Sequence, residues 1–313
     1  MSEFSFTWQA LDRIRISGRD SSRFLQGMVT NDVQILPEGG GCYAFHLDST
    51  GHVLADLTIL NCGTALELAV EPGFGESLAT SLEQYRIMER CRIDYLGEGR
   101  AMTLWGIGAQ EWAKTQDGRV GFGASEGDHV VVSDVPEDNH LVRMPLQLGV
   151  CYRWWLPSEA HDRARDLILA LGATERSSSD WEALRVRAGI PVFGIDFDSR
   201  TLAPETAQEG RAIHYRKGCY IGQEIVARID ARGRVRRTLC RLTLSEPLPS
   251  GTELNFEGEK AGRITSSARD LDSGLVYGIG YVRQEFQALG AVFTFEGRPV
   301  AELTPSSLDG GPR

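Results

Sequence analysis

A cysteine and a lysine two residues apart form the most chemically suggestive pair in this chain. Cys219 and Lys217 lie in the run KGCYIGQE, residues 217–224, and apolar residues follow it. This order predicts a helix that begins at the run. Unpaired N–H groups at a helix N-terminus, together with a nearby ammonium, favour a thiolate. The pattern therefore predicts a reactive thiolate at Cys219 with Lys217 as its charge partner. A small buried cysteine in a glycine-rich turn is the alternative interpretation.

Residues around this pair indicate room for a ligand. Gly218 and Gly222 would let another molecule approach the backbone closely, because they carry no side chain. Downstream, one acid stands among six arginines, at positions 228, 232, 234, 236, 237 and 241. This stretch, which begins at Arg228, is predicted to be either a seat for an anionic ligand tail or a solvated basic connector.

One acidic position stands out in the local pattern. Asp56 interrupts an apolar run, so its carboxylate must be exposed or hydrogen-bonded, since burying it unpaired is costly. Asn31 and Asp32 fit a plain turn, since both residue types tolerate such backbones.

Composition limits the classes of function. The 313 residues suffice for two or three domains, and the net charge of −10 argues against nucleic-acid binding. The six cysteines are widely spread, and none falls in a Cys/His cluster with zinc-site spacing, so no metal site is expected. The chain shows neither a signal-peptide pattern nor a long apolar run, and a reduced cytoplasmic location is expected.

The strands and helices expected along the chain, which must position these residues, indicate an α+β fold with antiparallel sheets. Alternating patterns indicate strands at 10–17, 42–47, 53–60, 65–70, 91–95, 102–107, 130–133, 141–144 and 150–155. Helices are expected after Asp20, at 74–88, at 158–171 and from Ser179, where a capping-box pattern ends in Glu182. Short strands at 239–244, 253–256, 260–265, 276–281 and 292–295 predict a small C-terminal barrel or sandwich.

Three blocks of sequence resemble a known family. Residues 217–228 resemble the signature of YgfZ-type proteins, which are folate-binding relatives of the glycine-cleavage aminomethyltransferase, the T-protein. Residues 17–33 are similar to the family's opening block, and residues 187–191 and 202–205 to two central segments. The resemblance covers residues 10 to about 300.

The resemblance implies a T-protein-like folate-binding fold in a ring-like arrangement of lobes. It implies a folate-binding part of two lobes at 1–235, a C-terminal β-barrel domain at 236–305 and a flexible tail at 306–313. Tetrahydrofolate or a one-carbon derivative is the implied cofactor. The site residues it implies, besides the catalytic Cys219 and Lys217, are Asn31, Asp32, Asp56, Arg187, Glu205, Gly218, Tyr220, Gly222, Gln223 and Arg228.

This chain departs from T-proteins at two positions. Ala55 precedes Asp56 where T-proteins carry two adjacent aspartates, and one of those acts near the reactive folate nitrogen. Arg187 stands where T-proteins typically carry a pterin-binding glutamate, and Glu205 is the candidate replacement.

Three classes of function follow, and whether the protein is an enzyme stays open. The first is a folate-binding protein that supports the assembly or repair of iron–sulfur enzymes through Cys219. The second is a folate-dependent aminomethyl- or methyltransferase, and the third is a folate-sensing scaffold without chemistry. The expected partners are the folate and iron–sulfur enzymes or their assembly proteins, without nucleic acid or membrane.

Overall fold

The computed structural model describes residues 4–116, 125–135, 138–233, 235–270 and 272–304. The chain divides into two compact units, and each is described by itself. Unit 1 comprises Met1–His46, Ala55–Ser178 and Arg216–Ile221, whereas unit 2 comprises Leu47–Leu54, Ser179–Tyr215 and Gly222–Arg313. The predicted tail at 306–313 lies outside the described residues. Within the described part of the chain, no helix is both long enough and apolar enough to cross a membrane.

Unit 1 is built around one nine-stranded, almost wholly antiparallel sheet, with strand order β2-β3-β4-β1-β5-β8-β7-β6 and β9 paired to β1 in parallel. Its ends approach each other, since the His129 N–H donates to the Gly39 carbonyl at 2.9 Å, and the sheet is therefore curled. The strands are β1 Ser5–Ser17, β2 Gly41–Leu47, β3 Val53–Asn61, β4 Ala65–Val70, β5 Arg92–Trp105, β6 His129–Val130, β7 His140–Arg143, β8 Cys151–Leu156 and β9 Thr174–Glu175.

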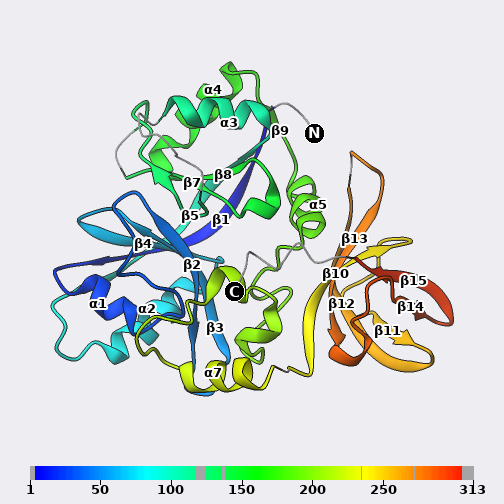
Figure 1. The fold of residues 1–313 in the computed structure, drawn as a ribbon. Coiled ribbons are helices and arrows are strands. Elements are labelled where there is room, and N and C mark those ends of the chain that lie inside the picture. Colours follow the sequence, from blue (N-terminus) through cyan, green and yellow to red (C-terminus); the bar gives the residue numbers. More distant parts are fainter. Residues whose placement is uncertain (1–3, 117–124, 136–137, 234, 271, 305–313) are drawn as a thin grey trace. The chain divides into compact units, whose positions relative to one another are not determined.

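Alternation along the strands gives the sheet two different faces. On the outer face, helices cover two cores. Helices α1 (Ser21–Gln26) and α2 (Gly75–Tyr85) pack on Ile14, Leu57 and Leu68, while α3 (Ile107–Thr115) and α4 (His161–Ala170) pack on a core that contains Trp154 (Figure 1). The inner face holds a smaller apolar cluster of Leu11, Leu60, Ala69, Ala101, Val142 and Trp155.

The inner face also carries polar side chains, from strand positions that alternate with the residues of the outer face. Asp56 lies on the same face of β3 as Leu60, and Arg13 lies on the same face of β1 as Leu11. Both side chains are buried. The curl of the sheet therefore encloses charged groups that a flat sheet would expose.

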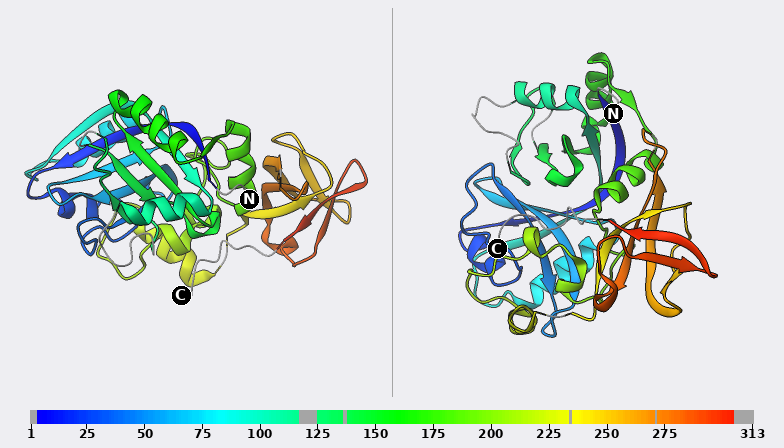
Figure 2. Two further views of the ribbon diagram at one scale, coloured as in Figure 1. Left: turned by 90° about the horizontal axis from the view of Figure 1, so that it is seen from above. Right: turned by 45° about the vertical axis from the view of Figure 1, so that its right-hand side comes forward.

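Unit 2 ends in a closed barrel with strand order β10-β13-β12-β11-β14-β15, drawn in yellow to red in Figures 1 and 2. The barrel strands are β10 Arg237–Leu244, β11 Glu253–Phe256, β12 Glu259–Arg269, β13 Val276–Arg283, β14 Val292–Phe295 and β15 Arg298–Leu303. The helices before it are α5 Ser178–Ala188, α6 Glu209–Ala212 and α7 Gln223–Arg232. Short 3-10 turns of the whole chain lie at Leu146–Leu148, Ser158–Ala160, Ala203–Thr206 and Gln284–Phe286.

The predicted α+β class and C-terminal barrel are confirmed, with several local differences. Strand β5 is continuous where two strands, 91–95 and 102–107, were expected. Helix α3 and strand β15 were not expected at all. Glu182, expected to complete a capping box, instead accepts hydrogen bonds from the buried Arg185 guanidinium at 2.6 and 2.7 Å.

Candidate functional site

Lys217 is a buried cation that holds the signature segment against the loop after α1. Its Nζ donates to the carbonyls of Gln26 and Val29 at 2.6 Å each and to the Asn31 carbonyl at 2.8 Å. The side chain also lies over the Tyr220 ring at 5.1 Å. Burial lowers the pKa of Lys217 to about 8, while the three carbonyl dipoles favour the charged form.

The last residue of α1 and the loop that follows it turn their carbonyls toward groups from two other segments. Besides the three carbonyls bound by Lys217, the Gly27 carbonyl accepts from the Ile221 N–H at 3.2 Å and the Met28 carbonyl contacts His46 Nδ1 at 2.8 Å. A helix end leaves carbonyls without intrahelical partners, and buried ones must be satisfied from elsewhere. Residues 217–221 therefore supply the groups that let this loop adopt its buried path.

Cys219 is presented differently from the prediction. Helix α7 begins at Gln223 with Gly222 as its N-cap, so Cys219 lies three residues before the cap, and the prediction that it opens the helix is wrong. Cys219 is nonetheless exposed, whereas the other cysteines are half-buried or buried. The carbonyl bonds of Lys217 give that residue a positioning task, and its role as charge partner of Cys219 stays a prediction.

Asn31 and Asp32 brace the same loop. Asn31 Nδ2 donates to the Tyr43 carbonyl at 2.8 Å, and Asp32 Oδ1 accepts from Gln26 Nε2 at 3.0 Å and from the Gln34 N–H at 3.1 Å. Both residues are only half-buried. Asp32 forms an Asx-type turn, which fits the predicted turn, and a role of these two residues in lining a ligand pocket stays a prediction.

Asp56 joins this region through Tyr43. The Tyr43 hydroxyl donates to Asp56 Oδ2 at 2.8 Å, and the carboxylate is 8% exposed on the inner face of the sheet. Unit 1 thus brings together seven of the predicted residues: Asn31, Asp32, Asp56, Lys217, Gly218, Cys219 and Tyr220. A buried ammonium, a buried carboxylate and an exposed thiol are linked through one loop and one tyrosine.

The remaining predicted residues belong to unit 2. Arg187 Nη1 forms an ion pair with Asp270 at 3.0 Å. Glu205 is buried in the 3-10 turn Ala203–Thr206, with Arg237 Nε 3.4 Å from its carboxylate. On α7, Gln223 is half-buried and Arg228 is exposed.

Gly222 shows why that position requires glycine. Its φ is +81°, and a Cβ there would lie 2.6 Å from the Asp48 carbonyl oxygen. Any other residue would be strained and would clash with backbone, so Gly222 serves a tight turn within unit 2.

Unit 2 also holds a cationic pocket that the sequence did not reveal. The pocket has a volume of about 450 Å³, and its lining includes Arg200, Arg237, Lys260 and Arg263 together with residues 194–198. Hydrogen bonds from Arg200 lower the pKa of Asp198 in its wall. The excess of cations suits an anionic group such as a carboxylate or phosphate. Only Arg237 was marked in advance, as part of the basic stretch, because the others come from separate turns and strands.

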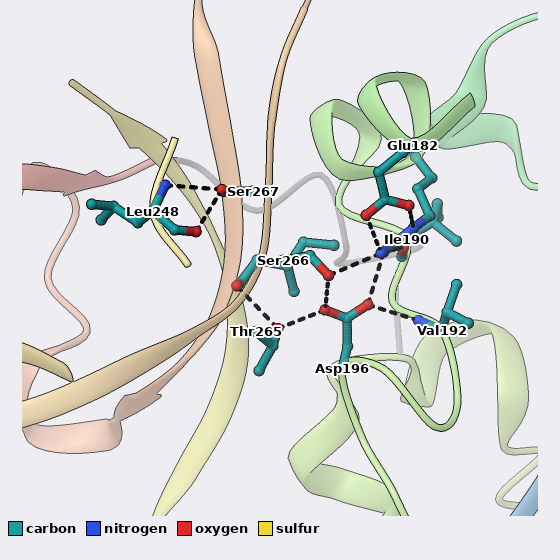
Figure 3. A network of polar contacts seen from close by, with 10 residues as sticks. Glu182, Ile190, Val192, Asp196, Leu248, Thr265, Ser266 and Ser267 are labelled. Carbon is teal, nitrogen blue, oxygen red and sulfur yellow. Dashed lines mark hydrogen bonds and ion pairs between the residues drawn. The ribbon is translucent and has the colours of Figure 1, made fainter. Parts of the chain in front are cut away.

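A buried ion-pair network fixes the loop that forms one wall of this pocket. Asp196 accepts from Arg185 Nη1 at 2.8 Å, from the Val192 N–H at 3.0 Å, and from the hydroxyls of Thr265 and Ser266 at 2.6 and 2.7 Å (Figure 3). Its side chain is fully buried. The network joins α5 and the loop after it to strand β12 of the barrel.

Comparison with known proteins places this geometry in context. No family model matches the chain. It is 26% identical to a putative chloroplastic transferase of Arabidopsis thaliana, over 90% of this chain and 66% of the relative, so it spans just under two thirds of that protein. It is 28% identical to the tRNA-modifying protein YgfZ of Yersinia enterocolitica, over 76% and 71% of the two chains, and 27% identical to that of Escherichia fergusonii, over 83% and 79%.

The fold has a solved counterpart. The glycine cleavage system aminomethyltransferase T from Bartonella henselae superposes with a TM-score of 0.83 over 98% of this chain and 87% of the other, at 16% identity. The predicted resemblance to YgfZ-type proteins and the predicted T-protein-like fold are therefore confirmed.

Proposed function

We propose that this protein binds tetrahydrofolate or a one-carbon derivative and supports the assembly or repair of iron–sulfur enzymes through Cys219. The observation that carries the proposal is the Lys217 anchor. Three carbonyl bonds fix residues 217–221 to the loop after α1 and leave one thiol exposed beside a braced, polar loop. A thiol held on a rigid segment and open to solvent is suited to react with a group carried by another molecule.

The residues fit a folate in part. The Asp56 carboxylate, which the Tyr43 hydroxyl holds in place, could accept N–H bonds from a heterocycle. Arg187, by contrast, is engaged by Asp270 and has the wrong charge for a pterin N–H donor, which leaves Glu205 as the acid that could replace the T-protein glutamate. The cofactor would supply the one-carbon unit, and the chain would orient it and exclude water.

The YgfZ relatives are named tRNA-modifying proteins, which suggests that the proposed function is connected to tRNA modification. A chain with a net charge of −10 is poorly suited to grip a phosphate backbone. An indirect role is consistent with this charge, in which an iron–sulfur enzyme that modifies tRNA is the client.

Folate binding is tested by calorimetry with tetrahydrofolate. A specific pocket should bind at about 1 μM or tighter. Asp56→Asn should weaken binding, because the amide presents an N–H group where the carboxylate accepts. The control Glu98→Gln, on an exposed position of β5, should bind like the wild type. Absence of heat and of any thermal shift at millimolar folate would refute the proposal.

The cellular role is tested in a strain that lacks its own protein of this kind. Wild type should restore the activity of cluster-dependent enzymes, whereas Cys219→Ser should not, because a serine hydroxyl is not ionised at neutral pH and is a poor soft-metal ligand. Cys42→Ser, at a half-buried position, is the matched control and should rescue. Equal rescue by Cys219→Ser would favour the scaffold, and rescue of glycine cleavage that depends on Asp56 would favour the transferase.

A further inference from the structure

A second group of chemically active side chains lies in unit 1 and plays no part in the proposed function. Cys62 comes from the turn between β3 and β4, His129 from β6 and His140 from β7. One ligand atom from each lies within 4.8 Å of the other two. We propose that Cys62, His129 and His140 form a binding site for one Zn²⁺ ion, with the fourth coordination position open to water or an external ligand.

The distances between the three ligand atoms suit a tetrahedral ion. With Zn–S near 2.3 Å and Zn–N near 2.0–2.1 Å, tetrahedral angles place sulfur and nitrogen about 3.5–3.6 Å apart. Cys62 Sγ lies 3.6 Å from His129 Nε2 and 3.8 Å from His140 Nε2. Shifts of a few tenths of an ångström would bring these two sulfur–nitrogen distances to the tetrahedral values. The two histidine nitrogens lie within 4.8 Å of each other, and rotation of the rings can bring them to the roughly 3.3 Å expected across a tetrahedral ion.

His129 is oriented by its second ring nitrogen. Nδ1 lies 3.3 Å from the Gly127 carbonyl, so a proton on Nδ1 leaves Nε2 unprotonated toward the sulfur. Metal-binding histidines commonly donate their other N–H to a carbonyl in this way. A Cβ on Gly127 would lie 2.5 Å from the Gly41 carbonyl carbon, and this close approach of the two backbones keeps the loop before β6 against β2.

His140 is held by its place in the sheet. It pairs across the strands with Trp155, and the two rings meet edge to face at 6.2 Å. Among the described residues, the hydrogen-bonding neighbour of the His140 ring is the Cys62 sulfur, 3.9 Å from Nδ1 and 3.8 Å from Nε2. Both histidines are buried, and Cys62 packs against the inner apolar cluster of the sheet.

The surrounding charges leave the site close to neutral. Arg13 and Arg15 lie nearby, and both are ion-paired with Glu67 and Asp138. Two cations are thus balanced by two carboxylates, and a divalent ion bound by one thiolate would add a single positive charge. One thiolate and two imidazoles favour Zn²⁺ over Mg²⁺ or Ca²⁺, which prefer oxygen ligands. Binding exchanges the Cys62 thiol proton for the metal and releases that proton to solvent.

Residue spacing does not predict this site, because Cys62 lies 67 residues from His129 and 78 from His140. It is brought together by the curl of the sheet. The proposal stands apart from folate binding and from Cys219, so it survives or fails independently of them.

The test is titration of the full-length, chelator-treated protein with Co²⁺ as a spectroscopic probe, followed by displacement with Zn²⁺. One Co²⁺ per chain should bind, with a thiolate-to-cobalt charge-transfer band and the intense visible bands of a tetrahedral site. Cys62→Ser should abolish the charge-transfer band and weaken Zn²⁺ binding by more than about 100-fold, because losing a ligand costs more than losing its supporting contacts. His140→Asn should weaken binding similarly.

Two variants are the matched controls. Cys219→Ser and Cys42→Ser should keep the band and the affinity, since neither cysteine belongs to the cluster. Circular dichroism of metal-free samples separates loss of ligand from loss of fold, and Cys62→Ser changes one atom of a half-buried side chain. Retention of the charge-transfer band by Cys62→Ser, its loss in Cys219→Ser, or the absence of stoichiometric binding to the folded wild type would each overturn the proposal.

Discussion

Two buried cations, Arg185 in unit 2 and Lys217 in unit 1, are held by opposite kinds of partner. In unit 2, Arg185 is bound by the carboxylates of Asp196 and Glu182. Burial alone would lower the pKa of Arg185, but these charges outweigh it and raise the pKa. In unit 1, Lys217 is bound by neutral backbone carbonyls, and burial lowers its pKa to about 8.

The difference in partners indicates different roles, with Arg185 stabilising unit 2 and Lys217 positioning a segment of unit 1. A guanidinium between carboxylates keeps its charge at any physiological pH and joins α5 to the barrel. An ammonium among carbonyls can lose its proton close to neutral pH, and it fixes only the loop after α1 and the segment that carries Cys219. We therefore infer that the Arg185 network serves stability and that the Lys217 contacts serve the site.

The largest effect on stability should come from breaking the buried ion pair between Arg185 and Asp196. Asp196→Ala leaves the Arg185 charge buried without its main partner, and we expect a loss of about 3–5 kcal/mol in the free energy of unfolding. Asp198→Ala, which removes an exposed ion pair with Arg200, is the control and should cost less than about 1 kcal/mol. Urea unfolding followed by circular dichroism measures both. Equal losses would mean that burial of the Arg185 pair does not set its importance.

A smaller effect is expected from Lys217→Met. The substitution keeps much of the side-chain volume but leaves three loop carbonyls without their donor, and we expect a loss of about 2–3 kcal/mol. Lys114→Met, at an exposed position of α3, should change stability by less than about 0.5 kcal/mol. The same urea experiment compares them. A Lys217→Met protein as stable as the wild type would show that water can replace the ammonium.

Acid should weaken the same loop through His46. Burial lowers the pKa of His46 below its ordinary value of 6.5, so the folded state holds the ring neutral between Met28 and Ser81. Between the folded and unfolded pKa values only the unfolded state binds the proton. Stability should therefore be complete above pH about 6.5 and fall below it, by at most about 1.4 kcal/mol per pH unit for one proton.

Unfolding curves of the wild type and of His46→Gln across this pH range provide the measurement. The variant should show a shallower fall but not a flat one, because burial also lowers the pKa of His140 to about 3. Identical slopes would contradict the role of His46.

Much of the fold could be predicted from local pattern, and the failures have physical causes. Strands with clear alternation were placed within a few residues. The two strands expected at 91–95 and 102–107 are one strand, β5, in which Gly97 with its positive φ lies at a bulge opposite Arg13 and Ile14. Strand β15 contains Pro299, a residue that is uncommon in strands, and the strand is held by its place in the closed barrel. Helix α3 did carry a signal, since Ala109, Trp112 and Ala113 are spaced to face one core.

The candidate site could be predicted only in part. The motif identified Lys217 and Cys219 by residue type. The partners of Lys217 are backbone carbonyls, however, and a carbonyl has no signature in the sequence. Clusters built by the curl of a sheet, such as Cys62 with His129 and His140, depend on strand order, which local pattern does not reveal.

The smallest effect on stability should come from Cys219→Ser, because the side chain is exposed, and we expect a change within about 0.5 kcal/mol. By contrast, we expect Cys219 to react with alkylating agents faster than the other five cysteines. Burial raises the pKa of Cys42, Cys62 and Cys151 to about 12 and that of Cys240 to about 11, and it raises that of Cys91. Brief treatment with iodoacetamide at neutral pH, read by mass spectrometry, should therefore modify Cys219 at least about 10-fold faster than the others.

Lys217→Met then tests whether the anchor acts on the thiol. If the ammonium only positions the segment, Cys219 should alkylate at least as fast once the loop loosens. If its charge stabilises the thiolate, alkylation should slow. Slow modification of Cys219 in the wild type would argue against both roles, because an exposed thiol without reactivity would serve neither a nucleophile nor a cluster ligand.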